Sequence, residues 1–237
     1  IPSDLLLDAI PDAVIVMHED TTVRSWNGAA ERIFGHAAAE AVGGKLTDLI
    51  VPPGDVEEEL QHIRQVMTTG LAVYEALRRC KDGTLVHVSV STKAIREADG
   101  RLAFILSTKK DVTHLKLLRE AKLVQTKFGE LLESTPDAIV MVNITGRIVL
   151  VNSQAEKVFG HSRETLLGEP VERLLPPRFR TAHHGHRGSF FAQPRARSMG
   201  AGLERYGLRA NGDEFPVEIS LSPLETEEGT LVMRAIR

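Results

Sequence analysis

The stretch IPDAVIVMHEDTTVRSWNGAAERIFGH (residues 10–36) returns later in the chain as TPDAIVMVNITGRIVLVNSQAEKVFGH (residues 135–161). The two stretches align without a gap at an offset of 125 residues. Solenoid repeats recur every ~20–50 residues and in more than two copies, so this repeat is of another kind. We therefore expect two homologous domains of about a hundred residues each, which suits a chain of 237 residues.

Each copy carries the same local signals in its first half. A short apolar run, a turn and a second short run are typical of a β-hairpin. Asn27 and Asn152 end this hairpin and stand where a helix N-cap belongs, just ahead of an apolar helical pattern. Gly35 and Gly160 follow the last apolar residue of that pattern, which predicts the end of the helix.

The second half of each copy predicts strands. VHVSVS (residues 86–91) and FPVEISLS (residues 215–222) alternate with a period of two, each behind a turn at Asp82-Gly83 or Asn211-Gly212. The expected order in each copy is two strands, short helices, a longer helix and three strands. This order predicts an α+β fold in which helices cover one face of a five-stranded antiparallel sheet.

This layout and its motifs resemble the Per-Arnt-Sim (PAS) family of sensor domains. The matching motifs are PDA at the entry, N-x-x-A-E-x-x-F-G-H after the second strand, the KDG or NGD hairpin, and Asp111-Val112-Thr113 at the end of the first copy. The resemblance implies a first PAS domain at residues 1–113, a helical connector at 114–133 and a second PAS domain at 134–237. It also implies the sensory part of a bacterial signalling protein.

The output of such a protein is expected outside this sequence. The second copy ends at Arg237, where the closing triplet would follow, so we expect the native chain to continue. The resemblance suggests a sensor histidine kinase of a two-component system as the commonest output, followed by diguanylate cyclases and phosphatases. Phosphate-binding loops, nucleophile elbows and zinc-protease motifs are all missing from the sequence, so we do not expect this chain to be an enzyme.

The composition of the chain is that of a globular protein and argues against nucleic-acid binding and a membrane span. Hydrophobic residues make up 42% and charged residues 26% of the chain, as in ordinary globular domains. The net charge of −3 gives no general attraction to nucleic acid, and no apolar stretch is long enough to span a membrane. A single cysteine, Cys80, excludes internal disulfides, so we expect a reducing, cytoplasmic location.

The connector at residues 114–133 has a seam of apolar residues at heptad spacing. Its members are Leu117, Ala121, Val124, Phe128 and Leu131. One interpretation is an amphipathic helix that packs on the sheet of its own domain. The other, which we favour from the sequence, is a coiled-coil-like seam that joins two copies of the chain into a homodimer.

An unusual run of arginines and histidines occupies residues 176–202, in the second copy alone. In a helix, Phe179, His183, His186 and Phe190 would share one face, because they are spaced at 0, 4, 7 and 11. A histidine on a core-facing stripe can ligate iron, and arginines can hold carboxylates. Haem needs both kinds of group.

This run is similar to the haem-binding PAS oxygen sensors, where a histidine of the longest helix is the proximal ligand. The resemblance implies haem b in the second domain, His183 as its metal ligand, and His186, Phe179 and Phe190 around it. The remaining candidate residues of the cofactor site are Arg195, Arg197 and Met199. The choice among His183, His184 and His186 as the ligand stays open.

The departures from that pattern leave two other functions open. The distal arginine and methionine of those sensors would fall at Leu203 and Ala201, so the usual gas-contacting residues are missing. One alternative is a cofactor-free module for dimerisation and signal relay. The other is a sensor of a small anionic metabolite that binds to the arginine cluster. We expect no cofactor in the first domain, where Trp26 is interpreted as a core residue.

Overall fold

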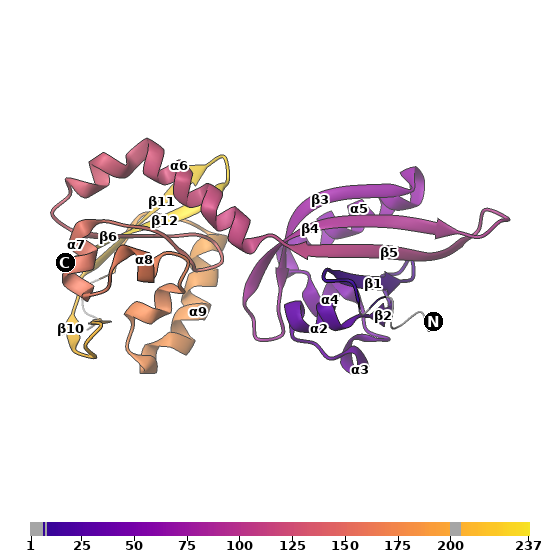
Figure 1. The fold of residues 1–237 in the computed structure, drawn as a ribbon, viewed down its shortest axis with the longest axis horizontal. Helices are drawn as coiled ribbons and strands as arrows, with labels where there is room; N and C mark the ends of the chain where they lie inside the picture. The colour runs from indigo at the N-terminus through magenta and orange to yellow at the C-terminus, as the bar shows by residue number, and fades with distance from the viewer. Residues whose placement is uncertain (1–6, 8, 200–204) are drawn as a thin grey trace. The chain divides into compact units, whose positions relative to one another are not determined.

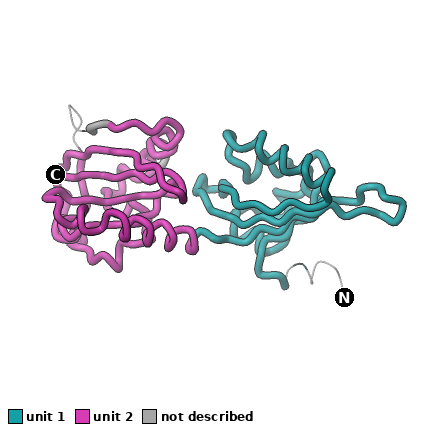
Figure 2. Tube along the Cα trace, turned by 90° about the horizontal axis from the view of Figure 1, so that it is seen from above, with its two compact units in different colours: residues 1–113 teal, residues 114–237 magenta. Residues whose placement is uncertain are grey.

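The computed structural model describes residues 7, 9–199 and 205–237. The chain divides into two compact units, Ile1–Thr113 and His114–Arg237 (Figure 2). Each unit is an α+β domain built around a five-stranded sheet in which every strand pairs antiparallel with its neighbours. The fold class expected from the repeat is therefore confirmed.

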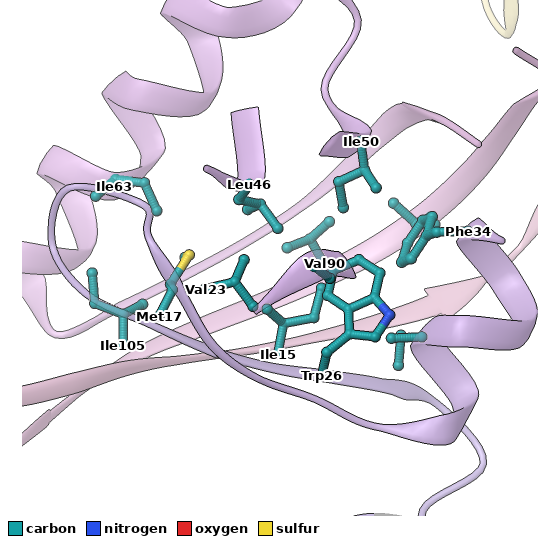
Figure 3. Close-up of a cluster of buried hydrophobic side chains, with 14 of the residues drawn as sticks. Ile15, Met17, Val23, Trp26, Phe34, Leu46, Ile50, Ile63, Val90 and Ile105 are labelled. Carbon is teal, nitrogen blue, oxygen red and sulfur yellow. The ribbon is translucent and has the colours of Figure 1, made fainter. Parts of the chain in front are cut away.

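Unit 1 has the predicted order of elements (Figure 1). They are β1 (Ala13–Met17), β2 (Val23–Trp26), α2 (Gly28–Phe34), α3 (Ala38–Ala41), α4 (Leu46–Ile50), η1 (Pro53–Asp55), α5 (Val56–Thr69), β3 (Leu71–Arg79), β4 (Leu85–Arg96) and β5 (Leu102–Asp111). The sheet order is β2-β1-β5-β4-β3. Its core lies between the helices and one sheet face, where Trp26 and Phe34 pack with ring centroids 5.6 Å apart (Figure 3). Trp26 is thus a core residue.

Unit 2 has the same plan, with α6 ahead of its first strand and with a separate two-stranded ribbon. Its elements are α6 (Thr113–Glu133), β6 (Ala138–Val142), β7 (Ile148–Val151), α7 (Ser153–Phe159), α8 (Arg163–Leu166), η2 (Val171–Leu174), α9 (Pro177–Ala192), β8 (Arg197–Met199), β9 (Tyr206–Leu208), β10 (Glu214–Pro216), β11 (Ile219–Thr226) and β12 (Gly229–Ile236). The sheet order is β7-β6-β12-β11-β8, and β9 pairs with β10 in a separate ribbon.

The single strand expected over residues 215–222 is therefore wrong in detail. β10 ends at Pro216, which has no N–H to donate to a neighbouring strand. The next N–H, of Val217, donates to the carbonyl oxygen of Arg205 at 2.9 Å, and β11 begins two residues later. The chain thus leaves the ribbon at the proline and enters the main sheet as β11.

The repeated asparagines and glycines have the same role in both units. The side-chain oxygens of Asn27 and Asn152 each accept a hydrogen bond from the N–H three residues later at 3.0 Å. Each also accepts a hydrogen bond of 2.9 Å from the first strand of its unit. Gly35 and Gly160 end the helices with φ of 76° and 71°, in the left-handed region that glycine adopts without strain. These predicted caps are confirmed.

The long helix α6 packs on the outer face of the sheet of unit 2, while α7, α8 and α9 cover the inner face (Figure 1). Val124 is fully buried there, and Leu117 and Phe128 pack against the same cluster. The seam that we assigned to a dimer is thus used mainly within its own domain, which is the first of the two interpretations. The homodimer itself stays a prediction. Within the described residues, α6 and every other helix fall short of the length and apolar character that a membrane crossing requires.

Candidate functional site

A cavity of about 130 Å³ lies in unit 2 between α9 and the inner face of the sheet. Phe179, His183, His186 and Phe190 all line it. The helical spacing of these four residues therefore brings them to one place, as expected from their common face. Pro177 stands at the first turn of the helix, where a missing N–H costs nothing.

The far wall of the cavity comes from the sheet. Leu221 on β11 and Val232 on β12 form a buried cluster with Phe190. Arg234 lies two residues beyond Val232 on the same strand face and pairs in register with Leu221. An arginine thus takes an inward position between the buried apolar residues Val232 and Ile236.

Glu172 is the carboxylate behind this cavity. It belongs to η2, and its side chain is 5% exposed. Its Oε1 accepts hydrogen bonds from His183 Nδ1 and from Arg187, both at 2.7 Å. Burial alone would raise the pKa of Glu172, but the hydrogen bond from His183 and the charge of Arg187 outweigh it and lower the pKa to about 2. Glu172 is therefore ionised at neutral pH.

Arg234 fixes the proton of His183. Both terminal nitrogens of Arg234 lie 3.2 Å from His183 Nε2. A guanidinium can only donate, so Nε2 accepts, and the ring proton must be on Nδ1, which donates to Glu172. Burial, reinforced by the charge of Arg234, lowers the pKa of His183 below its ordinary value, although the hydrogen bond to Glu172 opposes this shift. His183 is thus a neutral link between a carboxylate and a guanidinium.

Two arginines at this cavity keep unused donors. The Nε atoms of Arg234 and Arg205 are buried and have no hydrogen-bond partner among the described residues. Burial lowers the pKa of Arg234 to about 10, so this guanidinium keeps its charge at neutral pH. The described lining includes Arg187 as the third arginine and contains no acidic residue. Glu172 behind it balances one of the three charges.

The position of Arg187 leaves no room for a side chain at Gly146. Gly146 lies in the turn between β6 and β7 with a φ of 80°. A Cβ added there would lie 1.8 Å from a terminal nitrogen of Arg187. The guanidinium therefore passes directly over this turn, which fixes Arg187 beside Glu172.

The other predicted site residues are not placed at the cavity. Arg195 is exposed and does not line it. Arg197 and Met199 lie on β8, whose backbone pairs with β11, but their side chains fall outside the described part of the structure. Ala201 and Leu203, the positions of the distal residues in haem sensors, also fall outside it.

The residues as they are arranged do not fit haem. Nε2 of His183, the nitrogen that would ligate iron, is occupied by Arg234. The cavity of about 130 Å³ is close to the ~150 Å³ of an engineered cavity that accepts benzene, whereas haem is a macrocycle of four pyrroles. Among the described residues, no three histidine, cysteine, aspartate or glutamate side chains gather as a metal site. The expectation of His183 as a haem ligand therefore disagrees with this geometry.

Unit 1 has a different group at the helix position of His183. Pro53 and Pro177 are the second prolines of the two Pro-Pro pairs. Glu59 lies six residues after Pro53, and His183 lies six residues after Pro177. The carboxylate of Glu59 forms a buried ion pair with Arg78 of β3. In both units the long helix is thus joined to the sheet by a buried polar contact, with different chemistry.

A buried lysine lies near this ion pair. Lys109 on β5 is fully buried and donates to Ser107 Oγ at 2.6 Å. Burial lowers the pKa of Lys109 to about 7, although the charge of Glu59 opposes the shift. Tyr74 adds a hydrogen bond of 2.9 Å to Glu59. The interior of unit 1 therefore already contains its own anion.

Comparisons with protein families match both units. The family described as PAS fold matches residues 4–112, and the family described as PAS domain matches residues 136–236. Together the two matches span most of the chain, and they leave out the whole of α6.

Known proteins similar to this chain are longer than it. Sensor protein FixL of Bradyrhizobium diazoefficiens is 25% identical over 208 residues, which cover 87% of this chain and 41% of FixL. Protein CrtJ of Rhodobacter capsulatus is 26% identical over 158 residues, which cover 66% of this chain and 32% of CrtJ. The chain thus spans less than half of either relative. A PAS domain of Colwellia psychrerythraea has a solved structure that is 24% identical, covers 47% of this chain and 95% of that chain, and has a TM-score of 0.45.

Proposed function

Because the chain belongs to the PAS family and consists of two PAS domains, we propose that it is a sensory region whose second domain detects a small anion. FixL is named a sensor protein, and this chain matches 41% of its length. The proposal includes an output module elsewhere in the native protein, with a histidine kinase as the expected type. A cytoplasmic location belongs to the proposal and is supported by the single cysteine.

The observation that carries the proposal is the positive charge of the cavity, which Arg187, Arg205 and Arg234 line without an acidic residue among the described lining. Arg234 and Arg205 each present a buried Nε–H without a partner among the described residues. Leaving a charged donor buried and unpaired costs free energy, and an anion in the cavity would remove that cost. Arginine forks are also well suited to carboxylate oxygens. This arrangement supports an anion over a neutral ligand.

The relay that we propose runs through β12. Arg234 and Val232 face the cavity, and the alternate residue Leu231 is fully buried on the opposite face. Leu231 belongs to the same apolar cluster as Val124 of α6. A ligand that pulls on Arg234 would therefore move a strand whose other face carries the connecting helix. The helix α6 would pass this movement to the parts of the chain that it connects.

Haem is the competing ligand, and the resemblance to haem-binding PAS sensors is its support. Haem binding would require that Arg234 leave His183 and that the cavity widen greatly. In that case His183 Nε2 would hold the iron, Glu172 would orient the ring through Nδ1, and the haem would supply gas or redox chemistry. The small-anion proposal needs neither rearrangement.

The test compares both ligand classes on the full chain. Haemin is added to the protein and to the His183→Ala and His184→Ala variants, and absorbance near 400 nm is recorded. In parallel, thermal unfolding is measured in sodium benzoate, acetate or phosphate against sodium chloride at equal ionic strength. We expect no Soret band that depends on His183, and a higher melting temperature with at least one of these anions. A Soret band lost only in His183→Ala would overturn the proposal in favour of haem, and no response to any ligand would favour the relay module.

A further inference from the structure

The volume of the cavity in the second domain suits a ligand with a single ring. Its volume of about 130 Å³ is slightly below the ~150 Å³ of a cavity that binds benzene. A short aliphatic acid would leave part of this volume empty, and the lining would then lose its contacts with the ligand.

The walls of the cavity are aromatic on one side and aliphatic on the other. Phe179 and Phe190 of α9 face it, and the rings of Phe190 and Phe191 meet edge to face at 6.3 Å. Leu221 and Val232, 6% and 2% exposed, close it from the sheet. Aromatic side chains pack well on a further ring, with its face or edge toward them.

The donors define the charged end of the ligand. Arg187 is held by Glu172, and the terminal nitrogens of Arg234 are turned to His183. What remains is one Nε–H of Arg234 and one Nε–H of Arg205, for which no partner is found among the described residues. Two such donors match the two oxygens of one carboxylate. A phosphate would bring further oxygens against apolar walls, where they would stay unsatisfied.

From this geometry we infer that the second domain binds an aromatic monocarboxylate of benzoate size. Its carboxylate lies between Arg234 and Arg205, and its ring lies among Phe179, Phe190 and Val232. The inference rests on the proposed anion-sensing function and narrows its ligand to one chemical class.

The experiment follows 4-fluorobenzoate by fluorine NMR in the presence of the full chain. Unlabelled benzoate, benzamide, acetate and phosphate are then added as competitors at equal ionic strength. Benzoate should displace the probe. Benzamide has the same shape without the charge and should bind at least about tenfold more weakly, since charge-assisted hydrogen bonds contribute most to such recognition. Acetate and phosphate should also be at least about tenfold weaker, because they lack the ring.

Arginine variants locate the site. Arg234→Gln and Arg205→Gln should each weaken probe binding by about ten- to a hundredfold, which corresponds to one charged hydrogen bond. Arg173→Gln is the matched control, because Arg173 pairs with Glu169 on the surface of the same domain and should leave binding unchanged. If the buried Arg234 variant fails to fold, the half-buried Arg205 still decides the question.

Each result has a separate meaning. Acetate or phosphate competing as well as benzoate would overturn the aromatic ligand and keep the anion sensor. If benzamide competed as well as benzoate, the inference that the ligand carries a carboxylate would be overturned. No binding of the probe or of any other anion would overturn the proposed function together with this inference.

Discussion

Replacing Glu172 with glutamine should destabilise the second domain by about 3 kcal/mol at pH 7. The carboxylate is 5% exposed, and its pKa is lowered from the ordinary value of 4.5 to about 2 in the folded domain. Each pKa unit corresponds to ~1.4 kcal/mol, which gives the predicted loss. The physical cause is that His183 and Arg187 keep their buried donors but lose the charge that those donors face.

The pH dependence of this difference has a definite sign. The folded pKa of Glu172 lies below the unfolded one, so the unfolded state binds more protons between pH 4.5 and 2. The stability that Glu172 contributes is therefore complete above about pH 5 and is lost as the pH falls towards 2. The free energies of unfolding of the original chain and of Glu172→Gln should converge over that range.

The assay uses two probes of urea unfolding on the full chain. The single tryptophan, Trp26, lies in the first domain, while far-ultraviolet circular dichroism reports on both domains. Glu172→Gln should shift the dichroism transition of the second domain and leave the Trp26 fluorescence transition in place. Glu169→Gln is the control, because the Glu169 side chain is 44% exposed and its ion pair contributes little. Equal stability of Glu172→Gln and the original chain at pH 7 would refute the reasoning.

Three further predictions concern other parts of the chain. The free energy of unfolding of the first domain should rise by up to ~1.4 kcal/mol per pH unit above about pH 7. The reason is that burial lowers the pKa of Lys109 to about 7, so the unfolded state keeps the proton to higher pH than the folded state does. Lys109→Met should remove this pH dependence from the unfolding followed by Trp26 fluorescence. Asn152→Ala should lower the free energy of unfolding of the second domain by about 2 kcal/mol or more, as measured in urea. The substitution removes a buried helix cap whose side-chain oxygen accepts two hydrogen bonds and whose side-chain nitrogen donates two. If the predicted dimer uses the exposed side of α6, Leu118→Glu should convert dimers to monomers in sedimentation; a monomeric original chain would show that the dimer prediction is wrong.

The parts of the fold that follow from neighbouring residues were predictable from the sequence. A cap depends on one asparagine and the N–H three residues later, so the repeated Asn27 and Asn152 indicated two helix starts correctly. The common face of Phe179 and His183 follows from helical spacing alone. These signals are local and do not depend on which elements pack together.

The parts that depend on distant segments were not predictable in the same way. Glu172 and Arg234 come from η2 and β12, and only the folded chain brings them to His183. Their signals in the sequence were weak: a glutamate in a short turn, and an arginine where a strand pattern calls for an apolar residue. The seam of α6 was ambiguous for another reason, since a helix buries the same stripe against a sheet or against a second helix. Val124 shows that the sheet is its partner.

The most direct test of an anion sensor at Arg234 and Arg205 is a calorimetric titration of the full chain with sodium benzoate. The account predicts one binding site per chain, with an affinity at least about tenfold lower in Arg205→Gln and unchanged in Arg173→Gln. Absence of binding to the original chain, or equal affinity in Arg205→Gln, would contradict it.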